Sequence, residues 1–196
     1  MGGRAGDFDP TAAVFAGLLT RAQQGQGSAW EQLYRWLAPT VAGYLRVQGA
    51  RQVDDLTSEV FLALVRAIGT FRGNATQFRS FVFVIAHRRL QDERRREYRR
   101  TEHEVRESFD EATAGGAVAG NEGGEALGRL AGERVLAMCA TLSPDQRDVV
   151  LLRVVVDLSL EQVAAVVGKT RAAVKALQHR AFEQIRKEIS REAVSP

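Results

Sequence analysis

The chain has 196 residues, of which 45% are hydrophobic, and it carries a net charge of +3. This is enough apolar material for one domain or two small ones, and it excludes wholesale disorder. A single cysteine excludes an intrachain disulfide, the three histidines lie at no metal-ligand spacing, and there is neither an apolar stretch of about 18 residues nor a signal-like start, so we expect a cytoplasmic protein without cofactor or metal.

The first elements predicted are amphipathic helices. Residues 1–24 are interpreted as an N-terminal arm and the start of a first helix. Ser28 followed by Glu31 is typical of a capping box, and apolar side chains then recur at helical spacing to about Gly49. A second helix is predicted over Val53–Ile68, because apolar residues recur at four-residue spacing and acids occupy the first turn. Those apolar residues are Leu56, Val60, Leu64 and Ile68.

A strongly basic segment follows. Gly69–Thr76 is predicted to be a loop, and from Gln77 a long helix carries the apolar run 81–86 into residues 87–100, which contain seven arginines. Residues 72–100 have nine arginines and three acids, a local charge of +6. Such a stretch is either a solvated helix end or a surface that binds an anionic partner.

The next segment has the opposite charge. Residues 101–132 are predicted to form an acidic flexible linker, because seven glycines lie between 108 and 132 without any apolar period. Helical signals return at 134–142. Two further capping boxes follow, Ser143 with Gln146 and Ser159 with Gln162. The chain is therefore predicted to be all-α, with two small helical domains joined by the linker.

The stretch "LEQVAAVVGKTRAAVKAL", residues 160–177, has the pattern of a helix-turn-helix. Ala164 is small where two helices cross, Gly168 supplies a left-handed turn, and Val174 packs the second helix on the first. The alternative is a simple core hairpin. In the helix-turn-helix, the second helix exposes polar side chains to a DNA major groove. These are Arg171, Lys175, Gln178, His179 and Arg180.

Three stretches together resemble the extracytoplasmic-function (ECF) sigma factors, specificity subunits of bacterial RNA polymerase. They are "DDLTSEVFLALVRAIGTFRG", "FRSFVFVIAHRRLQDERRR" and "LSPDQRDVVLLRVVVDLSLEQVAAVVGKTRAAVKALQHRA". The resemblance implies that residues 25–100 form sigma region 2, that residues 133–190 form region 4, and that 191–196 are a tail. It also implies a non-enzymatic initiation factor that binds core polymerase and promoter DNA.

The resemblance assigns roles to particular residues. Contact with the beta-prime coiled coil of polymerase falls to Asp54, Asp55, Ser58 and Glu59. Contact with the minus-10 element falls to Arg72, Asn74, Arg79, Arg88, Arg89, Arg95 and Arg96, of which the last two, with the rest of Arg94–Arg100, grip phosphates. Contact with the minus-35 element falls to Arg153, Thr170, Arg171, Lys175, Gln178, His179 and Arg180. The beta flap and an anti-sigma factor are the further partners implied.

The sequence departs from the family pattern at four positions. Serine at 58 replaces a common glutamine, and arginine at 88 replaces a common asparagine. Lys169 replaces an apolar residue and Leu177 an arginine. Two alternatives stay open. A stand-alone helix-turn-helix regulator explains only residues 133–190, and a nucleic-acid hydrolase lacks metal ligands and a nucleophile–base pair.

Overall fold

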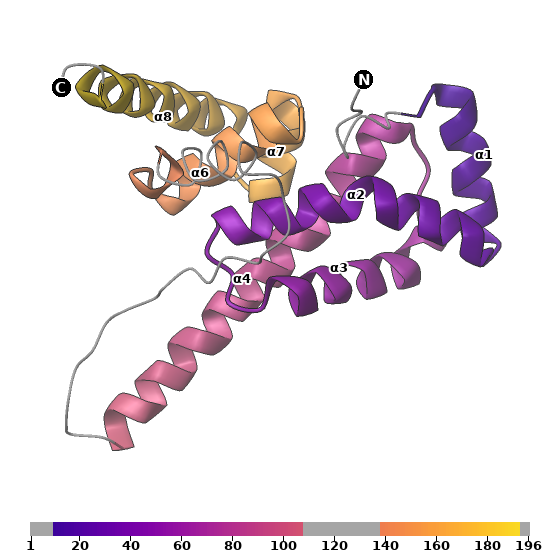
Figure 1. Cartoon of the computed structure of the whole chain (residues 1–196), viewed down its shortest axis with the longest axis horizontal. Helices are drawn as coiled ribbons and strands as arrows, with labels where there is room; N and C mark the ends of the chain where they lie inside the picture. The colour runs from indigo at the N-terminus through magenta and orange to yellow at the C-terminus, as the bar shows by residue number, and fades with distance from the viewer. Residues whose placement is uncertain (1–9, 108–137, 193–196) are drawn as a thin grey trace.

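A computed structural model describes residues 10–107 and 138–192, and every regular element in these two ranges is helical (Figure 1). This confirms the predicted all-α class. The helices are α1 (Ala12–Gln23), α2 (Gly27–Val47), α3 (Val53–Ala67), α4 (Ala75–Glu107), α6 (Pro144–Val150), α7 (Leu160–Val167) and α8 (Arg171–Glu192). A 3-10 turn at Ile68–Thr70 follows α3, and a π-helical turn at Leu151–Val155 follows α6. No described helix is both long and apolar enough to cross a membrane.

The N-terminal domain, α1 to α4, is a bundle around α4. The four predicted apolar positions of α3 are all buried, which confirms the four-residue pattern there. Phe78 of α4 is fully buried among aromatic rings, with its ring centroid 5.4 Å from Phe15, 6.4 Å from Trp36 and 5.1 Å from Phe71. The helix α1 therefore belongs to this core, and its first buried residue is Phe15.

The predicted capping box at the start of α2 was wrong. The helix α2 begins at Gly27 without a side-chain cap, so Ser28 and Glu31 form no capping box. Gly25, with φ of 79°, turns the chain so that the Trp30 N–H already bonds to the Gln26 carbonyl. Ser28 is thus already inside the helix, and Glu31 pairs with Arg35 at 2.5 Å instead.

The helix α4 is longer than predicted at both ends. It starts at Ala75 rather than Gln77, since Asn74 and Gln77 cap each other across its first turn. It continues to Glu107, so the first seven residues assigned to the linker are helical. No glycine or proline occurs in 101–107, and most of these residues tolerate a helix. The rest of the predicted linker lies outside the described residues, as do residues 134–137 of the helix predicted at 134–142.

The C-terminal domain, α6 to α8, matches its prediction closely. Ser143 with Gln146 and Ser159 with Gln162 form the two expected capping boxes. Gly168 ends α7 with φ of 66°, in the left-handed region where a side chain would be strained. Val163 and Val174 are fully buried between α7 and α8. These observations confirm the helix-turn-helix.

The two domains pack against each other. The helix α7 lies on α4, and one continuous apolar core includes buried residues of both domains. Beside this apolar contact, the Tyr44 hydroxyl donates a 2.5 Å hydrogen bond to Asp148 Oδ1 of α6. Burial, followed by the charge of Asp148 and this hydrogen bond, raises the pKa of Tyr44 well above its ordinary value of 10.0.

Alkaline pH tests this contact. Because an unfolded chain ionises at the ordinary pKa, the stability contributed by neutral Tyr44 is fully present below 10.0 and is lost as pH rises through the higher folded-state pKa. We expect the free energy of unfolding to fall by up to about 1.4 kcal/mol per pH unit in that window. Urea titrations between about pH 8 and about pH 11 measure the slope. Tyr44→Phe should flatten it, and equal slopes in both proteins would contradict the assignment.

Candidate nucleic-acid and partner interfaces

The second helix of the helix-turn-helix, α8, presents a polar face. Arg171, Lys175 and His179 are exposed one turn apart, and Arg180 is exposed beside them. Thr170 caps the helix, because its hydroxyl accepts from the Ala173 N–H at 3.2 Å. The predicted residues at the start of α8 are therefore brought together on one accessible surface. Gln178 differs from them in being half-buried.

Ion pairs hold the start of α8 to the rest of its domain. Arg171 pairs with Glu161 of α7 at 2.9 Å, and Lys169 pairs with Asp145 of α6 at 3.0 Å. The Glu161 backbone N–H and the Ser159 side chain lower the pKa of Glu161, with a smaller effect from Arg171. The carboxylate is therefore charged at neutral pH and keeps Arg171 oriented beside the helix start.

Arg153 is the one predicted minus-35 residue that precedes the helix-turn-helix, and its charge, like that of Arg171, acts on Glu161. Its side chain is partly buried, and its guanidinium donates to the Leu158 carbonyl within the turn before α7. Its Nε has no hydrogen-bond partner among the described residues. The structure thus gives Arg153 a part in shaping the turn around Asp157, which has φ of 58°.

In the N-terminal domain, the loop before α4 is held from two sides. Gln23 of α1 donates from Nε2 to the carbonyls of Ile68, at 3.0 Å, and Phe71, at 2.9 Å. Arg72 donates to the carbonyls of Gly69 and Phe71. The ring of Phe71 stacks on Phe81 with centroids 5.2 Å apart. Sequence reasoning missed Gln23, because nothing in its local pattern points to a loop some 45 residues away.

Gly73 and Asn74 complete this loop. The Gln77 N–H donates to Asn74 Oδ1 and the Asn74 N–H donates to Gln77 Oε1, both at 2.9 Å. A Cβ at position 73 would lie 2.7 Å from Gln77 Oε1 and 2.9 Å from the Phe71 ring. Asn74, predicted to contact DNA, is therefore also the cap of α4, and any side chain at position 73 would displace the Gln77 cap or the Phe71 ring.

The arginines of α4 have unequal surroundings. Arg88 is exposed in a groove between α4 and the end of α7, and Arg89 lies 3.6 Å from Glu59 of α3. Arg79 is half-buried. Arg94 turns inward and donates from Nη2 to the Gln48 carbonyl at 2.7 Å and to Gln48 Oε1 at 3.1 Å. Arg94 is thus part of the scaffold, whereas the sequence grouped it with the phosphate contacts.

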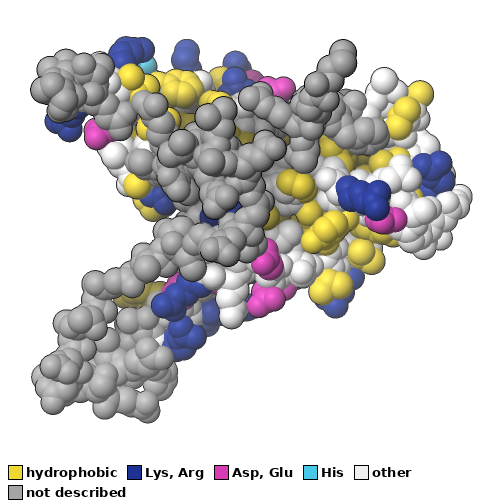
Figure 2. Space-filling view, viewed as in Figure 1, with side chains coloured by type: hydrophobic (Ala, Val, Ile, Leu, Met, Phe, Trp, Pro, Cys, Tyr) yellow, Lys and Arg dark blue, Asp and Glu magenta, His cyan; other side chains and the backbone are white. Residues whose placement is uncertain are grey.

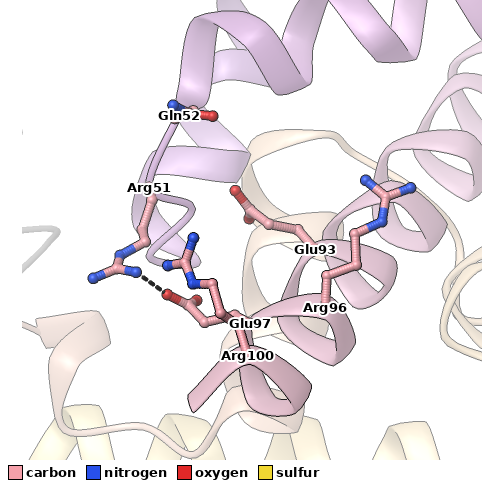
Figure 3. Close-up of a pocket in the computed structure, with 6 residues that line it drawn as sticks. All are labelled: Arg51, Gln52, Glu93, Arg96, Glu97 and Arg100. Carbon is pink, nitrogen blue, oxygen red and sulfur yellow. Dashed lines mark ion pairs between the residues drawn. The ribbon is translucent and has the colours of Figure 1, made fainter. Parts of the chain in front are cut away.

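Beyond Arg94, the helix forms a basic, solvent-exposed end. Arg95, Arg96 and Arg100 are exposed, and a shallow pocket lies between this end and the start of α3. Figure 3 shows the carboxylate of Glu97 between the guanidinium groups of Arg51 and Arg100, while Arg96 points away. Arg51 and Glu97 form an ion pair. Arg95 and Arg96 are therefore exposed to an external anion, and Arg96 is directed away from Glu97.

The helix α3 presents the predicted acidic face and an apolar extension of it. Asp54, Asp55 and Ser58 are exposed, and Glu59 is partly exposed. Leu62 and Val65 are 58% and 49% exposed, large fractions for aliphatic side chains inside a bundle. Figure 2 shows acidic side chains over one end of α3 and hydrophobic ones further along.

These α3 residues define what we call the α3 stripe: Asp55, Ser58, Leu62 and Val65. They follow one another at spacings of three or four residues, so they share one face of the helix. The sequence carried a signal for the two apolar members, since Leu62 and Val65 fall outside the buried four-residue pattern.

The described residues offer no metal centre and no activated thiol. Within 10–107 and 138–192, no three His, Cys, Asp or Glu side chains are placed to hold a metal ion. Burial raises the pKa of the Cys139 thiol, so it is protonated at neutral pH. The exposed side chains of α4 and α8 mainly donate hydrogen bonds and carry positive charge, which suits recognition of phosphates and base edges.

The comparisons with known proteins identify the class and then the family. Residues 29–100 match Sigma-70 region 2 and residues 140–187 match Sigma-70, region 4. A two-domain helical chain with these regions and a helix-turn-helix is a sigma factor of the sigma-70 type. The chain belongs to the ECF RNA polymerase sigma factors, as the resemblance had predicted.

Two relatives illustrate the match. The chain is 32% identical over 179 residues to the ECF RNA polymerase sigma factor BldN of Streptomyces coelicolor. This match covers 90% of this chain and 66%, just under two thirds, of that relative. It is 30% identical over 178 residues to the ECF RNA polymerase sigma factor SigD of Mycobacterium tuberculosis, covering 88% of this chain and 82% of the relative.

A solved structure shares the fold. This chain is similar to one in the structure of CnrH in complex with the cytosolic domain of CnrY, with a TM-score of 0.62 and 24% identity. The similarity covers 92% of this chain and 99% of the other.

The close approach at Gly73 can be tested by one methyl group. Gly73→Ala should displace the Gln77 cap or the Phe71 ring, because both lie within 3 Å of the added Cβ. We expect the free energy of unfolding, measured in urea, to fall by about 1–3 kcal/mol. Gly69→Ala is the matched control, since nothing lies within 4 Å of its Cβ. Similar values for both variants would show that the loop adapts freely.

Proposed function

We propose that this chain binds core RNA polymerase, directs it to promoters with minus-10 and minus-35 elements, and takes part in opening the DNA. The observation that carries the proposal is the pairing of two surfaces on one chain. One is the exposed face of α8, and the other is the loop at 71–74 followed by the arginines of α4. A stand-alone helix-turn-helix protein needs only the first.

The minus-35 element is read by α8. Its start at Thr170 and Arg171 favours a phosphate, because free N–H groups and the helix dipole point to it. Lys175, His179 and Arg180 continue along the groove-facing side. Ala172 and Ala176 are exposed on the same helix and let it approach DNA closely. Leu177 is half-buried, so that position contributes packing rather than a base contact.

The minus-10 element is read in melted form at the loop before α4. A base that leaves the stack exposes its whole Watson–Crick edge, and stacking on aromatic rings holds single strands. Phe71 is partly exposed and rests on Phe81. Asn74 and Arg79 supply hydrogen-bond donors at the start of α4, Arg88 supplies them further along the helix, and Arg95 and Arg96 hold the phosphates beyond it. The energy for opening the DNA then comes from the binding of the melted strand.

The polymerase contacts fall on other faces. The α3 stripe, with Asp54 and Glu59 beside it, is directed to the beta-prime coiled coil; its acidic half steers and its apolar half is desolvated on binding. On the C-terminal domain, exposed aliphatic side chains serve the beta flap. These are Val154, Val155 and Ile189. The proposal includes an anti-sigma factor, a protein that covers such surfaces until a signal arrives.

Reconstituted transcription tests the proposal. Core polymerase with this chain should give promoter-dependent RNA from fragments selected by the holoenzyme, and neither component alone should do so. Product should fall steeply with added salt, because phosphate contacts release counterions. The double variant Lys175→Ala and His179→Ala should reduce the dependence of transcription on the minus-35 element and leave its dependence on the minus-10 element unchanged. DNA binding without any promoter-dependent product would favour the stand-alone regulator.

The apolar half of the α3 stripe gives a separate prediction. Leu62→Ser should weaken binding to core polymerase by about fivefold or more, the effect of removing an interface side chain worth over about 1 kcal/mol. Its own stability should change little, since Leu62 is 58% exposed. Val14→Ser on α1, 50% exposed, is the matched control. Fluorescence anisotropy of each labelled variant, titrated with core polymerase, measures the two affinities, and equal affinities would remove Leu62 from the interface.

A further inference from the structure

A buried carboxylate joins the two domains. Asp148 of α6 is 3% exposed, and its Oδ1 accepts hydrogen bonds from the Tyr44 hydroxyl at 2.5 Å and from Gln48 Nε2 at 2.6 Å. His87 Nδ1 lies 3.5 Å from the same oxygen. Tyr44 and Gln48 lie at the end of α2, and His87 lies in α4. These three partners of the carboxylate thus all come from the other domain.

The hydrogen-bond directions form a consistent network. A carboxylate only accepts, so the Tyr44 hydroxyl donates to Asp148 and its oxygen is left to accept from His87 Nδ1–H, 3.0 Å away. Arg94 donates to Gln48 Oε1, which leaves Gln48 Nε2 to donate to Asp148. Each member satisfies the next, which is the condition under which a charge can be buried without large cost.

The contact extends beyond Asp148 in both directions. Next to it on α6, Arg147 Nη1 donates to the Val47 carbonyl at the end of α2, at 3.3 Å. At the other side, Gln162 Nε2 of α7 donates to the Thr76 carbonyl in the first turn of α4, at 3.4 Å. The C-terminal domain therefore covers α4 from Thr76, next to the loop proposed to read the minus-10 element, to the level of His87.

This arrangement conflicts with simultaneous reading of two promoter elements. Positions −35 and −10 are about 25 base pairs apart, or about 85 Å along B-DNA. In the structure, side chains of the two reading domains are in direct hydrogen-bond contact. Arg88 and Arg95 of α4 also line a groove whose other wall is Gly168 and Lys169, directly before the recognition helix. The domains must separate before both elements can be bound.

We propose that Asp148 is the latch of a closed, autoinhibited form of this sigma factor, in which the C-terminal domain covers α4 until polymerase and promoter draw the domains apart. The hydrogen-bonded part of the contact suits reversible opening, while the apolar part between α4 and α7 adds to closure. Water can hydrate Asp148, Tyr44, Gln48 and His87 once they separate, so each hydrogen bond contributes modestly to closure. The inhibitory part of this inference rests on the proposed function.

The test uses the full chain with a conservative substitution. Asp148→Asn keeps the side-chain size but removes the charge that Tyr44 and Gln48 donate to, and Tyr44→Phe removes the partner from the other domain. Asp157→Asn is the matched control, because Asp157 is exposed and asparagine tolerates its left-handed backbone. Small-angle X-ray scattering reports the radius of gyration, and circular dichroism verifies that each variant is folded.

We expect Asp148→Asn and Tyr44→Phe to increase the radius of gyration while Asp157→Asn does not. With a smaller closed population, binding to core polymerase should tighten by about tenfold. A variant as compact as wild type would overturn the latch. Expansion without tighter polymerase binding would overturn the inhibitory role. Failure of wild type to support promoter-dependent transcription, with expansion still seen, would instead reject the proposed function and leave only the domain contact.

Discussion

The burial of one face of α4 is the interaction on which the rest of the structure depends. Phe78, Val82, Phe83, Ala86 and Leu90 are fully buried, and they pack with α2 and α3 in one domain and next to α7 of the other. Burial of each of the larger side chains contributes about 1.5–3 kcal/mol. Because these residues recur every three or four positions, the opposite face of the same helix is left to the arginines. The helical repeat of α4 therefore places the core residues on one face and the basic surface on the other.

Each surface proposed to read DNA is supported by a core residue or a cap beneath it. The loop at 71–74 is held by Gln23, by the ring of Phe81 and by the Asn74 cap. The exposed face of α8 is positioned by Val174 and by the turn at Gly168. DNA contacts formed by such preorganised groups lose little conformational entropy on binding. The latch at Asp148 differs, because its partners lie in another domain and become hydrated when the domains part.

Local features were predictable and long-range partners were not. The capping boxes at Ser143 and Ser159 depend on residues three apart, and both formed as expected. The same motif at Ser28 failed because the turn at Gly25 starts the helix earlier. The contact roles of the individual arginines stay predictions, but their environments differ sharply. The sequence grouped Arg94 with its neighbours, although Gln48, 46 residues away, binds it inside the structure.

By itself, the sequence determined the helical class, the helix-turn-helix, the basic and acidic segments and the family to which the chain belongs. These depend on periodicity, capping and motif spacing, which are properties of neighbouring residues. Only the tertiary structure decided which arginines face solvent, that Leu62 and Val65 extend the acidic face of α3, and that Asp148 is buried against the N-terminal domain. The reason is physical: the burial and hydrogen bonding of a side chain depend on helices that are distant in sequence and meet only when the chain folds.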